Sequence, residues 1–349
     1  MGPGTATSQT FTKTYRRVTA VVPRKTATFH RVPVRAAVWD LGSSSFHLLL
    51  CEAGPGGSLH PVLRRRALLN LGMSVGASGD IPPERVTAAL SAARRLRAQL
   101  GSAGADVVVA LATAALRDAT NGPDVVRRLE RAIGVPVRVL DGEEEARLCF
   151  VGQRAGVWMP EGDSMGVDLG GGSLELAVGW GRPGGRIVVA TSVPIGPTRL
   201  KGELSTGDVL SSSDRSSIRE RTSGCLDDVK RHLSRFSGVT ERCVLSGGTA
   251  RALARIATSS IRRPPEASSA DVNQVELAAP QIGELAFQLA RMPLADRRAL
   301  AGMPPRRAPV LPLGATILEC LALELGIERY VVSEWGLREG ALLDALSRA

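Results

Sequence analysis

The stretch Gly166-Val-Asp-Leu-Gly-Gly-Gly-Ser-Leu-Glu-Leu-Ala-Val-Gly179 joins two apolar runs through a glycine triplet, which predicts a β-hairpin. Glycines accept positive φ and let backbone N–H groups approach an oxyanion, so such a turn can wrap a phosphate. The acids at its edges, Asp168 and Glu175, would repel a bare phosphate unless a divalent cation lay between them. The hairpin therefore predicts a metal and phosphate site, against the simpler interpretation of a tight turn between core strands.

A second copy of this pattern lies near the start, in Val38-Trp-Asp-Leu-Gly-Ser-Ser-Ser-Phe-His-Leu-Leu-Leu50. Asp40 and Asp168 hold equivalent places, 168 − 40 = 128 residues apart, which indicates an internal duplication. Two phosphate turns are therefore expected. Their predicted phosphate-binding residues are Gly42, Ser43, Ser44, Ser45, Gly170, Gly171, Gly172 and Ser173, and the predicted metal ligands are Asp40, Asp168 and Glu175.

The composition is that of a globular protein large enough for two domains, with 349 residues of which 44% are hydrophobic. No apolar run reaches the roughly 20 residues of a membrane span. The five cysteines form no C-x-x-C pair and the four histidines are dispersed, which argues against disulfides, a zinc site or histidine-based nucleophilic catalysis. We expect a cytoplasmic protein without membrane attachment.

The formal charge of +10 is concentrated at the amino end. Residues 1–35 hold seven basic residues and no acid, so the rest of the chain carries 10 − 7 = +3. A specific nucleic-acid partner is therefore not indicated, and genomic base composition is a simple explanation for the many arginines elsewhere. We expect residues 1–34 to form a disordered basic arm, although a transit peptide or an over-long start would look the same.

From residue 35 onward, strand and helix patterns alternate in an order that occurs twice. The first series is predicted as strands 36–42, 45–52 and 62–70, helix 83–100, strand 106–111, helix 114–133, strand 137–140 and helix 143–155. The second is predicted as strands 165–168, 173–179 and 186–193, helix 214–235, strand 242–246, helix 249–257, a loop 259–273, a helical region 280–325, strand 329–332 and helix 336–347.

Two such βββαβαβα series predict an α/β fold in which two RNase H-like lobes of the actin-like ATPase plan enclose a central cleft. The expected boundaries are 1–34 for the arm, 35–142 for lobe I, 143–333 for lobe II and 334–349 for a C-terminal helix that could return to lobe I.

Two further segments are expected at this cleft. Ala112-Thr-Ala-Ala-Leu-Arg117 follows an apolar strand, so Thr113 would cap a helix whose N-terminus favours an anion. Arg117 would lie one turn later and could bind phosphate oxygens, although a surface arginine is an equal alternative. Leu245-Ser-Gly-Gly-Thr249 repeats the design in lobe II, with Gly247, Gly248 and Thr249 as predicted phosphate-binding residues.

The segment Asp141-Gly-Glu-Glu-Glu-Ala-Arg147 should begin a helix at the junction of the lobes. Acids in a first helical turn are ordinary partners of the helix macrodipole. Glu144 and Glu145 are about 100° apart around a helix, so one can face solvent while the other faces the cleft. A carboxylate facing the cleft could orient and deprotonate an attacking water, as phosphoryl hydrolysis requires.

Together these blocks resemble the exopolyphosphatase and guanosine pentaphosphate phosphatase family of the actin-like superfamily. The similar blocks, in the order of that family, are Asp40–Leu48, Ala112–Arg117, Gly142–Leu148, Asp168–Glu175, Pro194–Leu200, Gly247–Arg251 and Gly336–Gly340. The resemblance implies that Glu145 is the catalytic base and that Arg117 clamps phosphate beside it. It also implies that Asp168 and Glu175 serve Mg²⁺ or Mn²⁺.

Two positions depart from the family pattern. Ser44 replaces an asparagine in the first turn and removes an amide donor. The block Ser333-Glu-Trp-Gly-Leu-Arg-Glu-Gly340 has glutamate and tryptophan at two places and resembles the short actinobacterial type, which lacks the C-terminal metal-dependent phosphohydrolase-like domain of longer members.

The resemblance implies hydrolysis of the terminal phosphoanhydride bond of inorganic polyphosphate, with release of orthophosphate. The closest alternative is hydrolysis of guanosine pentaphosphate, which would connect the chain to the stringent response. A nucleotide-operated actin-like binding protein could use the same turns, although no segment clearly supplies an adenine pocket. A catalytically weak polyphosphate sensor is a further interpretation, motivated by Ser44. Whether the chain forms a homodimer stays open.

Overall fold

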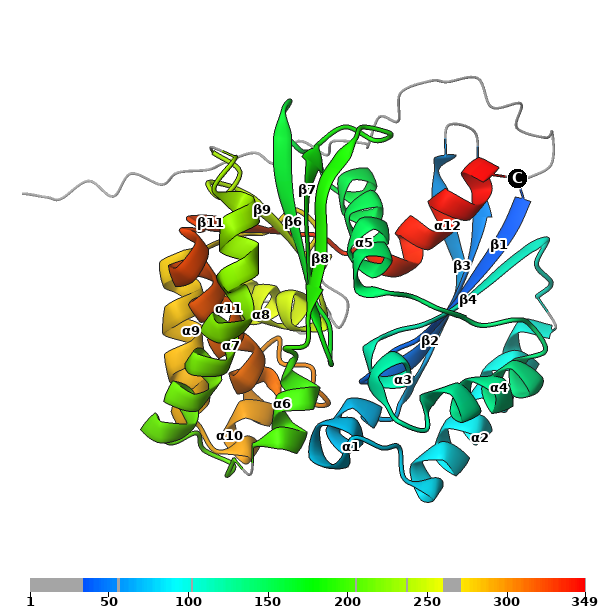
Figure 1. Ribbon diagram of the computed structural model, residues 1–349, viewed down its shortest axis with the longest axis horizontal. Coiled ribbons are helices and arrows are strands. Elements are labelled where there is room, and N and C mark those ends of the chain that lie inside the picture. The colour runs from blue at the N-terminus through cyan, green and yellow to red at the C-terminus, as the bar shows by residue number, and fades with distance from the viewer. Residues whose placement is uncertain are drawn as a thin grey trace, which may run out of the picture.

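The computed structural model describes residues 34–348 except 55–56, 102, 205, 237 and 260–270. Almost all of the predicted basic arm and most of the predicted loop 259–273 lie outside these residues. The described chain forms two α/β lobes, with helices α5 (Gly142–Gly156) and α12 (Leu337–Arg348) between their sheets (Figure 1). Among the described residues, no helix is both long and apolar enough to cross a membrane.

Lobe I is built on a sheet of order β3-β2-β1-β4-β5. Its strands are β1 (Val34–Leu41), β2 (Ser45–Ala53), β3 (Leu59–Leu68), β4 (Val107–Ala112) and β5 (Arg138–Val139). Strand β1 pairs antiparallel with β2 and parallel with β4, so it lies at the centre of the sheet. The helices of the lobe are α1 (Leu71–Ser78), α2 (Pro83–Gly101), α3 (Ala114–Asp118) and α4 (Gly122–Ile133).

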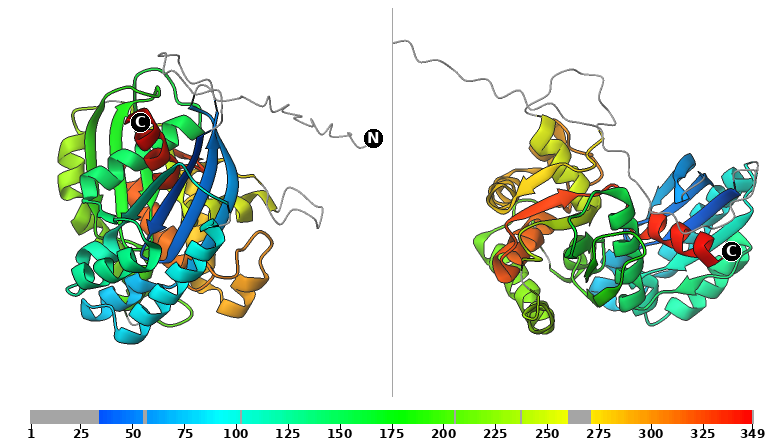
Figure 2. Two further views of the ribbon diagram at one scale, coloured as in Figure 1. Left: turned by 90° about the vertical axis from the view of Figure 1, so that its right-hand side faces the viewer. Right: turned by 90° about the horizontal axis from the view of Figure 1, so that it is seen from above.

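The two faces of this sheet are covered differently because side chains alternate along each strand. On one face, Trp39 and Leu48 join the core shared with α2 and α4. On the other face, Val38 and Leu49 pack against Leu342 of α12. Helix α12 therefore lies along the lobe I sheet, as the view from above shows (Figure 2).

Lobe II repeats the plan on a sheet of order β10-β11-β9-β6-β7-β8, in which β10 (Glu276–Ala278) is the added edge strand. The other strands are β6 (Asp163–Leu169), β7 (Leu174–Trp180), β8 (Ile187–Val193), β9 (Cys243–Gly247) and β11 (Arg329–Val332). Its helices are α6 (Pro197–Glu203), α7 (Ser212–Leu233), α8 (Gly248–Ser259), α9 (Ala279–Arg291), α10 (Leu294–Ala299) and α11 (Leu311–Leu325). The predicted fold of two RNase H-like lobes is confirmed.

Several helices differ from their predictions. The predicted helix 114–133 is two helices, because Asn121 bonds through its side chain to the backbone of Ile81 and interrupts the ladder between α3 and α4. Pro123 then restarts the helix in its first turn, where a missing N–H costs nothing. The predicted helical region 280–325 is three helices, and the short helices α1 and α6 were not predicted.

The unpredicted helices α1 and α6 join the two lobes on one side of the cleft (Figure 1). A Cβ at Gly76 of α1 would clash with the backbone oxygen of Arg199, and a Cβ at Gly202 of α6 would clash with that of Met73. These glycines therefore allow the backbones of α1 and α6 to come into direct contact. This contact, called the α1–α6 joint below, holds the two predicted phosphate turns together.

Candidate active site

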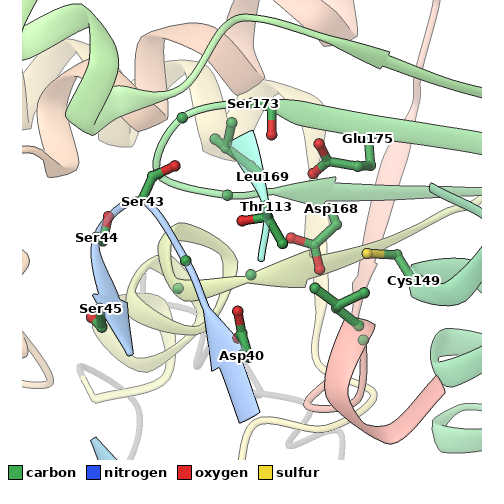
Figure 3. A pocket seen from close by; sticks show the side chains of 18 of the residues that line it. Asp40, Ser43, Ser44, Ser45, Thr113, Cys149, Asp168, Leu169, Ser173 and Glu175 are labelled. Atoms are coloured by element: carbon green, nitrogen blue, oxygen red, sulfur yellow. The ribbon is translucent and has the colours of Figure 1, made fainter. Parts of the chain in front are cut away.

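The two predicted phosphate turns face each other across the cleft (Figure 3). They close with the same hydrogen bond, from Gly42 N to Ser45 O at 3.2 Å and from Gly170 N to Ser173 O at 3.0 Å, as expected for duplicated elements. A Cβ at Gly172 would clash with the side chain of Ser43. The turns therefore approach so closely that only glycine fits between them.

A cavity of about 110 Å³ lies between the turns. Its lining includes most of the predicted site residues, namely Asp40, Gly42, Ser43, Ser44, Ser45, Thr113, Glu145, Asp168, Gly170, Gly171, Gly172, Ser173, Glu175, Gly247 and Gly248. Two predicted residues do not line it. Arg117 lies behind Glu145, and Thr249 packs against Gly314 of α11, where a Cβ would touch its side chain.

Glu145 lies in the cavity because of how α5 begins. Asp141 caps this helix by accepting a hydrogen bond from Glu144 N at 2.8 Å, and Glu145 follows Glu144 about 100° further around the helix. Glu145 is 5% exposed, whereas Glu144 points outward and forms an ion pair of 2.7 Å with Arg138. The structure therefore places Glu145, and not its neighbour, at the phosphate turns.

Arg117 holds Glu145 in position. Its Nη1 donates to Glu145 Oε2 at 2.8 Å and to Leu140 O at 3.1 Å, and its Nε donates to Asp118 Oδ1 at 3.1 Å. Burial and the neighbouring Glu175 raise the pKa of Glu145 well above its ordinary value, although Arg117 opposes the increase. Glu145 is thus a fixed carboxyl group with an increased affinity for a proton.

Four further acids line the cavity, namely Asp40, Asp168, Glu175 and Glu339, and the first two lie on equivalent strands of the lobes. Burial raises the pKa of Asp40, at the end of β1, to about 6, although Arg338 opposes it. Burial also raises the pKa of Asp168, at the end of β6, although this carboxylate accepts a hydrogen bond from Ser246. Burial, reinforced by Asp168, raises the pKa of Glu175 to about 7. Positive charge between these acids would favour their ionised forms.

The predicted metal ligands fit a particular kind of cation site. Among residues 34–348, outside the gaps noted above, no three His, Cys, Asp or Glu side chains converge as a metal cage. Mg²⁺ keeps several waters and is typically held by one or two carboxylates together with substrate phosphates. Asp40, Asp168 and Glu175, next to two phosphate turns, therefore suit a hydrated Mg²⁺ or Mn²⁺ shared with a phosphate.

The cavity also contains cationic residues that were not predicted, namely Arg251 of α8, Arg307 before α11 and Arg338 of α12. Arg338 Nη1 lies 3.1 Å from His47 Nδ1, and burial together with Arg338 holds the pKa of His47 well below its ordinary value, so the neutral ring accepts this hydrogen bond. Arg251 lies one helical turn after Gly247 and Gly248, where β9 ends and α8 begins. This spacing could have predicted that Arg251 lies at the phosphate site. Arg307 has no comparable signal in the sequence.

Residues 51–349 match the Ppx/GppA phosphatase family. The chain belongs to this family. It is 31% identical over 319 residues to Exopolyphosphatase 1 of Mycobacterium tuberculosis, which covers 90% of this chain and 88% of the relative. It is also 31% identical over 325 residues to Exopolyphosphatase 2 of the same organism, with coverage of 88% and 98%.

Solved structures of the Ppx/GppA family have the same fold. An exopolyphosphatase from Cytophaga hutchinsonii matches with a TM-score of 0.80 at 25% identity, over 90% of this chain and 98% of that one. A Ppx/GppA member from Aquifex aeolicus matches with a TM-score of 0.71 at 26% identity, with the same coverage. The resemblance inferred from the sequence blocks is therefore confirmed.

The two departures from the Ppx/GppA pattern have different places in the structure. Ser44 lines the cavity, but its hydroxyl is bonded to Thr198 Oγ1 of α6 at 2.6 Å and so joins the first turn to lobe II. Trp335 packs beside Gly156 of α5 and does not line the cavity. The serine therefore contributes a contact between lobes, and the tryptophan contributes packing behind the site.

Proposed function

We propose that this Ppx/GppA chain hydrolyses the terminal phosphoanhydride bond of inorganic polyphosphate and releases orthophosphate. The observation that carries the proposal is the pair of facing glycine turns with the buried, proton-attracting Glu145 beside them. Exopolyphosphatases are the named relatives that match most of the chain. The turns would hold the terminal phosphoryl group through their backbone N–H groups.

In the proposed reaction, a water molecule attacks the terminal phosphorus while Glu145 accepts its proton. Glu145 accepts a proton from a water molecule, and the water oxygen forms a bond to the terminal phosphorus. The bond between this phosphorus and the bridging oxygen breaks, so the shortened polyphosphate leaves with that oxygen. Arg117 keeps the carboxylate oriented during this step. One or two of the acids Asp40, Asp168 and Glu175 would hold Mg²⁺ or Mn²⁺, which would neutralise charge on the phosphate oxygens.

The cavity lining suits a chain of phosphates. Its described side chains are acids, serines, glycines and arginines, with His47, Thr113, Leu169, Leu337 and Cys149. A chain of phosphates needs cations and N–H donors, which this cavity supplies.

The five cysteines are all free, which supports the proposal of a reducing compartment such as the cytoplasm.

The test is to incubate the full chain with polyphosphate of defined length or with guanosine pentaphosphate, each with Mg²⁺, with Mn²⁺ or with a chelator. We expect orthophosphate from polyphosphate, progressive shortening of the polymer, and loss of activity with the chelator. Release of guanosine tetraphosphate without any hydrolysis of polyphosphate would contradict the proposal. So would the absence of hydrolysis with both cations.

A further inference from the structure

A row of side chains leads from the cavity to the edge of the lobe I sheet. Asp40 of β1 pairs directly with His47 of β2, which pairs directly with Arg66 of β3. Directly opposed residues of antiparallel strands have their side chains on the same face, with Cβ atoms about 4.5–5.5 Å apart. Asp40 and His47 line the cavity, and Arg66 lies one strand further out on the edge strand. The row therefore continues the cavity wall outward.

Lobe II presents arginines opposite this row. Arg251 and Arg255 lie one turn apart on α8, and Arg306 and Arg307 precede α11. The guanidinium of Arg307 lies against Gly248, where a Cβ would clash with it. The lobe II wall thus has arginines both inside the cavity and beyond it.

The electrostatic coupling shows that the two sets of arginines are close. Partial burial, Arg251 and Arg338 lower the pKa of Arg66. Partial burial lowers the pKa of Arg306, and Arg66 and Arg255 lower it further. Burial lowers the pKa of Arg307 to about 10, with contributions from Arg251, Arg306 and Arg66. Arg66 of lobe I and Arg306 of lobe II therefore lie close enough for their charges to interact.

These arginines form no ion pairs among the described residues, although the buried Asp168 attracts Arg251 and Arg307. In the described part of the chain, Arg66, Arg251, Arg306 and Arg307 have no carboxylate partner within 4.0 Å, although the molecule contains many such pairs elsewhere. Like charges held together cost free energy unless a polyanion binds them. A linear polymer with a negative charge on every phosphate matches a series of guanidinium groups that begins in the cavity and continues outside it.

We propose that Arg66 of lobe I and Arg306 of lobe II form an outer subsite that binds phosphates behind the terminal one and thereby sets a preference for long polyphosphate. This proposal rests on the proposed function of the cavity. It adds that the polymer leaves the cavity along the row Asp40, His47, Arg66. Because the two arginines belong to different lobes, a bound chain would also draw the lobes together.

The test uses Arg66→Ala, Arg306→Ala and the double variant, with Arg65→Ala as matched control. Arg65 is on the same exposed strand but pairs with Leu48, whose side chain lies in the core on the opposite face of the sheet. Binding of long polyphosphate and of tripolyphosphate is measured at several salt concentrations, beside phosphate release from both. Arg66 and Arg306 are exposed, so their alanine variants should still fold. Arg66→Lys keeps the positive charge and should therefore restore part of the binding.

We expect each alanine variant to bind long polyphosphate roughly tenfold more weakly, with a much smaller change for tripolyphosphate. The slope of log affinity against log salt should decrease by about 0.7 for each arginine removed. Equal changes for both lengths, or the same change in Arg65→Ala, would overturn the outer subsite while leaving the hydrolytic function intact. Length-dependent binding without phosphate release would support the subsite and refute the hydrolysis.

Discussion

Three features of one side chain support the proposed role of Glu145 as general base. It is buried, its pKa is raised, and Arg117 fixes one of its oxygens at 2.8 Å. Glu145→Gln keeps size and hydrogen bonding but removes the group that accepts the proton. We expect substrate binding to survive and turnover to fall by roughly 10²–10⁴-fold, the usual contribution of a general base. Phosphate release at saturating polyphosphate measures this effect.

Glu144→Gln is the matched control, because this neighbour forms an ion pair with Arg138 outside the cavity. A partly exposed pair of this kind contributes little, about 0–1 kcal/mol, so its loss should leave turnover almost intact. Melting temperatures of the two variants should be similar. Equal turnover in the two variants would remove Glu145 from the mechanism.

The buried carboxyl groups also predict how pH and metal act on stability. Asp40 and Glu175 have pKa values of about 6 and about 7 in the folded chain, above their ordinary values of 3.8 and 4.5. The folded state therefore binds more protons than the unfolded state between these values, and stability falls as pH rises through this window. Mg²⁺ should offset the loss because it binds the ionised forms. We expect Mg²⁺ to raise the melting temperature more at about pH 8 than at about pH 5. An equal increase at both pH values would argue against these acids as ligands.

Site residues could be predicted from the sequence where they belong to a short motif. The glycine turns indicate phosphate binding, and the acidic segment around Glu145 indicates a general base. Arg307 reaches the cavity only through the packing of the segment before α11, so nothing in its neighbourhood along the chain marks it. Arg338 lies in the block Gly336–Gly340, but only the packing of α12 shows that its side chain lines the cavity. Thr249 was predicted to bind phosphate because it opens a helix as Thr113 does. Its side chain packs against α11 instead of lining the cavity.

At the scale of elements, every strand except the three-residue β10 was predicted to within a few residues. Helices α1 and α6 were missed because their sequences, Leu-Gly-Met-Ser-Val-Gly-Ala-Ser and Pro-Thr-Arg-Leu-Lys-Gly-Glu, contain glycines that count against a helix. The structure explains these glycines, since Gly76 and Gly202 allow the two helices to touch. In α1 and α6, packing between the two helices outweighs the low helix propensity of glycine.

This joint can be tested by Gly202→Ala, with Gly224→Ala as control. A Cβ at Gly202 would meet the backbone of Met73, which cannot move aside cheaply, so we expect destabilisation of about 1–3 kcal/mol and weaker phosphate binding. Gly224 is exposed in the middle of α7 with no neighbouring atoms, so alanine there should stabilise by about 0.5–1 kcal/mol. Urea unfolding and KM for polyphosphate measure both effects. Wild-type stability and KM in Gly202→Ala would show that the joint does not position the turns.

At the scale of the whole molecule, few polar contacts hold the lobes across the cleft. Ser44 bonds to Thr198, and Arg199 of α6 pairs with Asp118 of α3. A hydrogen bond typically contributes about 0.5–1.5 kcal/mol and a surface ion pair about 0–1 kcal/mol, so these two contacts hold the lobes only weakly. The covalent connections near Gly142 and Ser333, where the chain passes from β5 to α5 and from β11 to α12, are the predicted hinges.

Substrate should therefore shift the molecule toward a closed arrangement, because a polyphosphate chain binds turns and arginines of both lobes at once. The α1–α6 joint is already formed in this structure and must be kept in the closed arrangement, so Gly202→Ala should hinder closure. We expect small-angle scattering to give a smaller radius of gyration for the wild-type chain with polyphosphate than without it, and a reduced change for Gly202→Ala. Orthophosphate alone, which occupies only the cavity, should produce a smaller contraction than the polymer. Identical profiles with and without polyphosphate would show that the lobes do not move, and the chain-length preference would then have to arise from a cleft of fixed width.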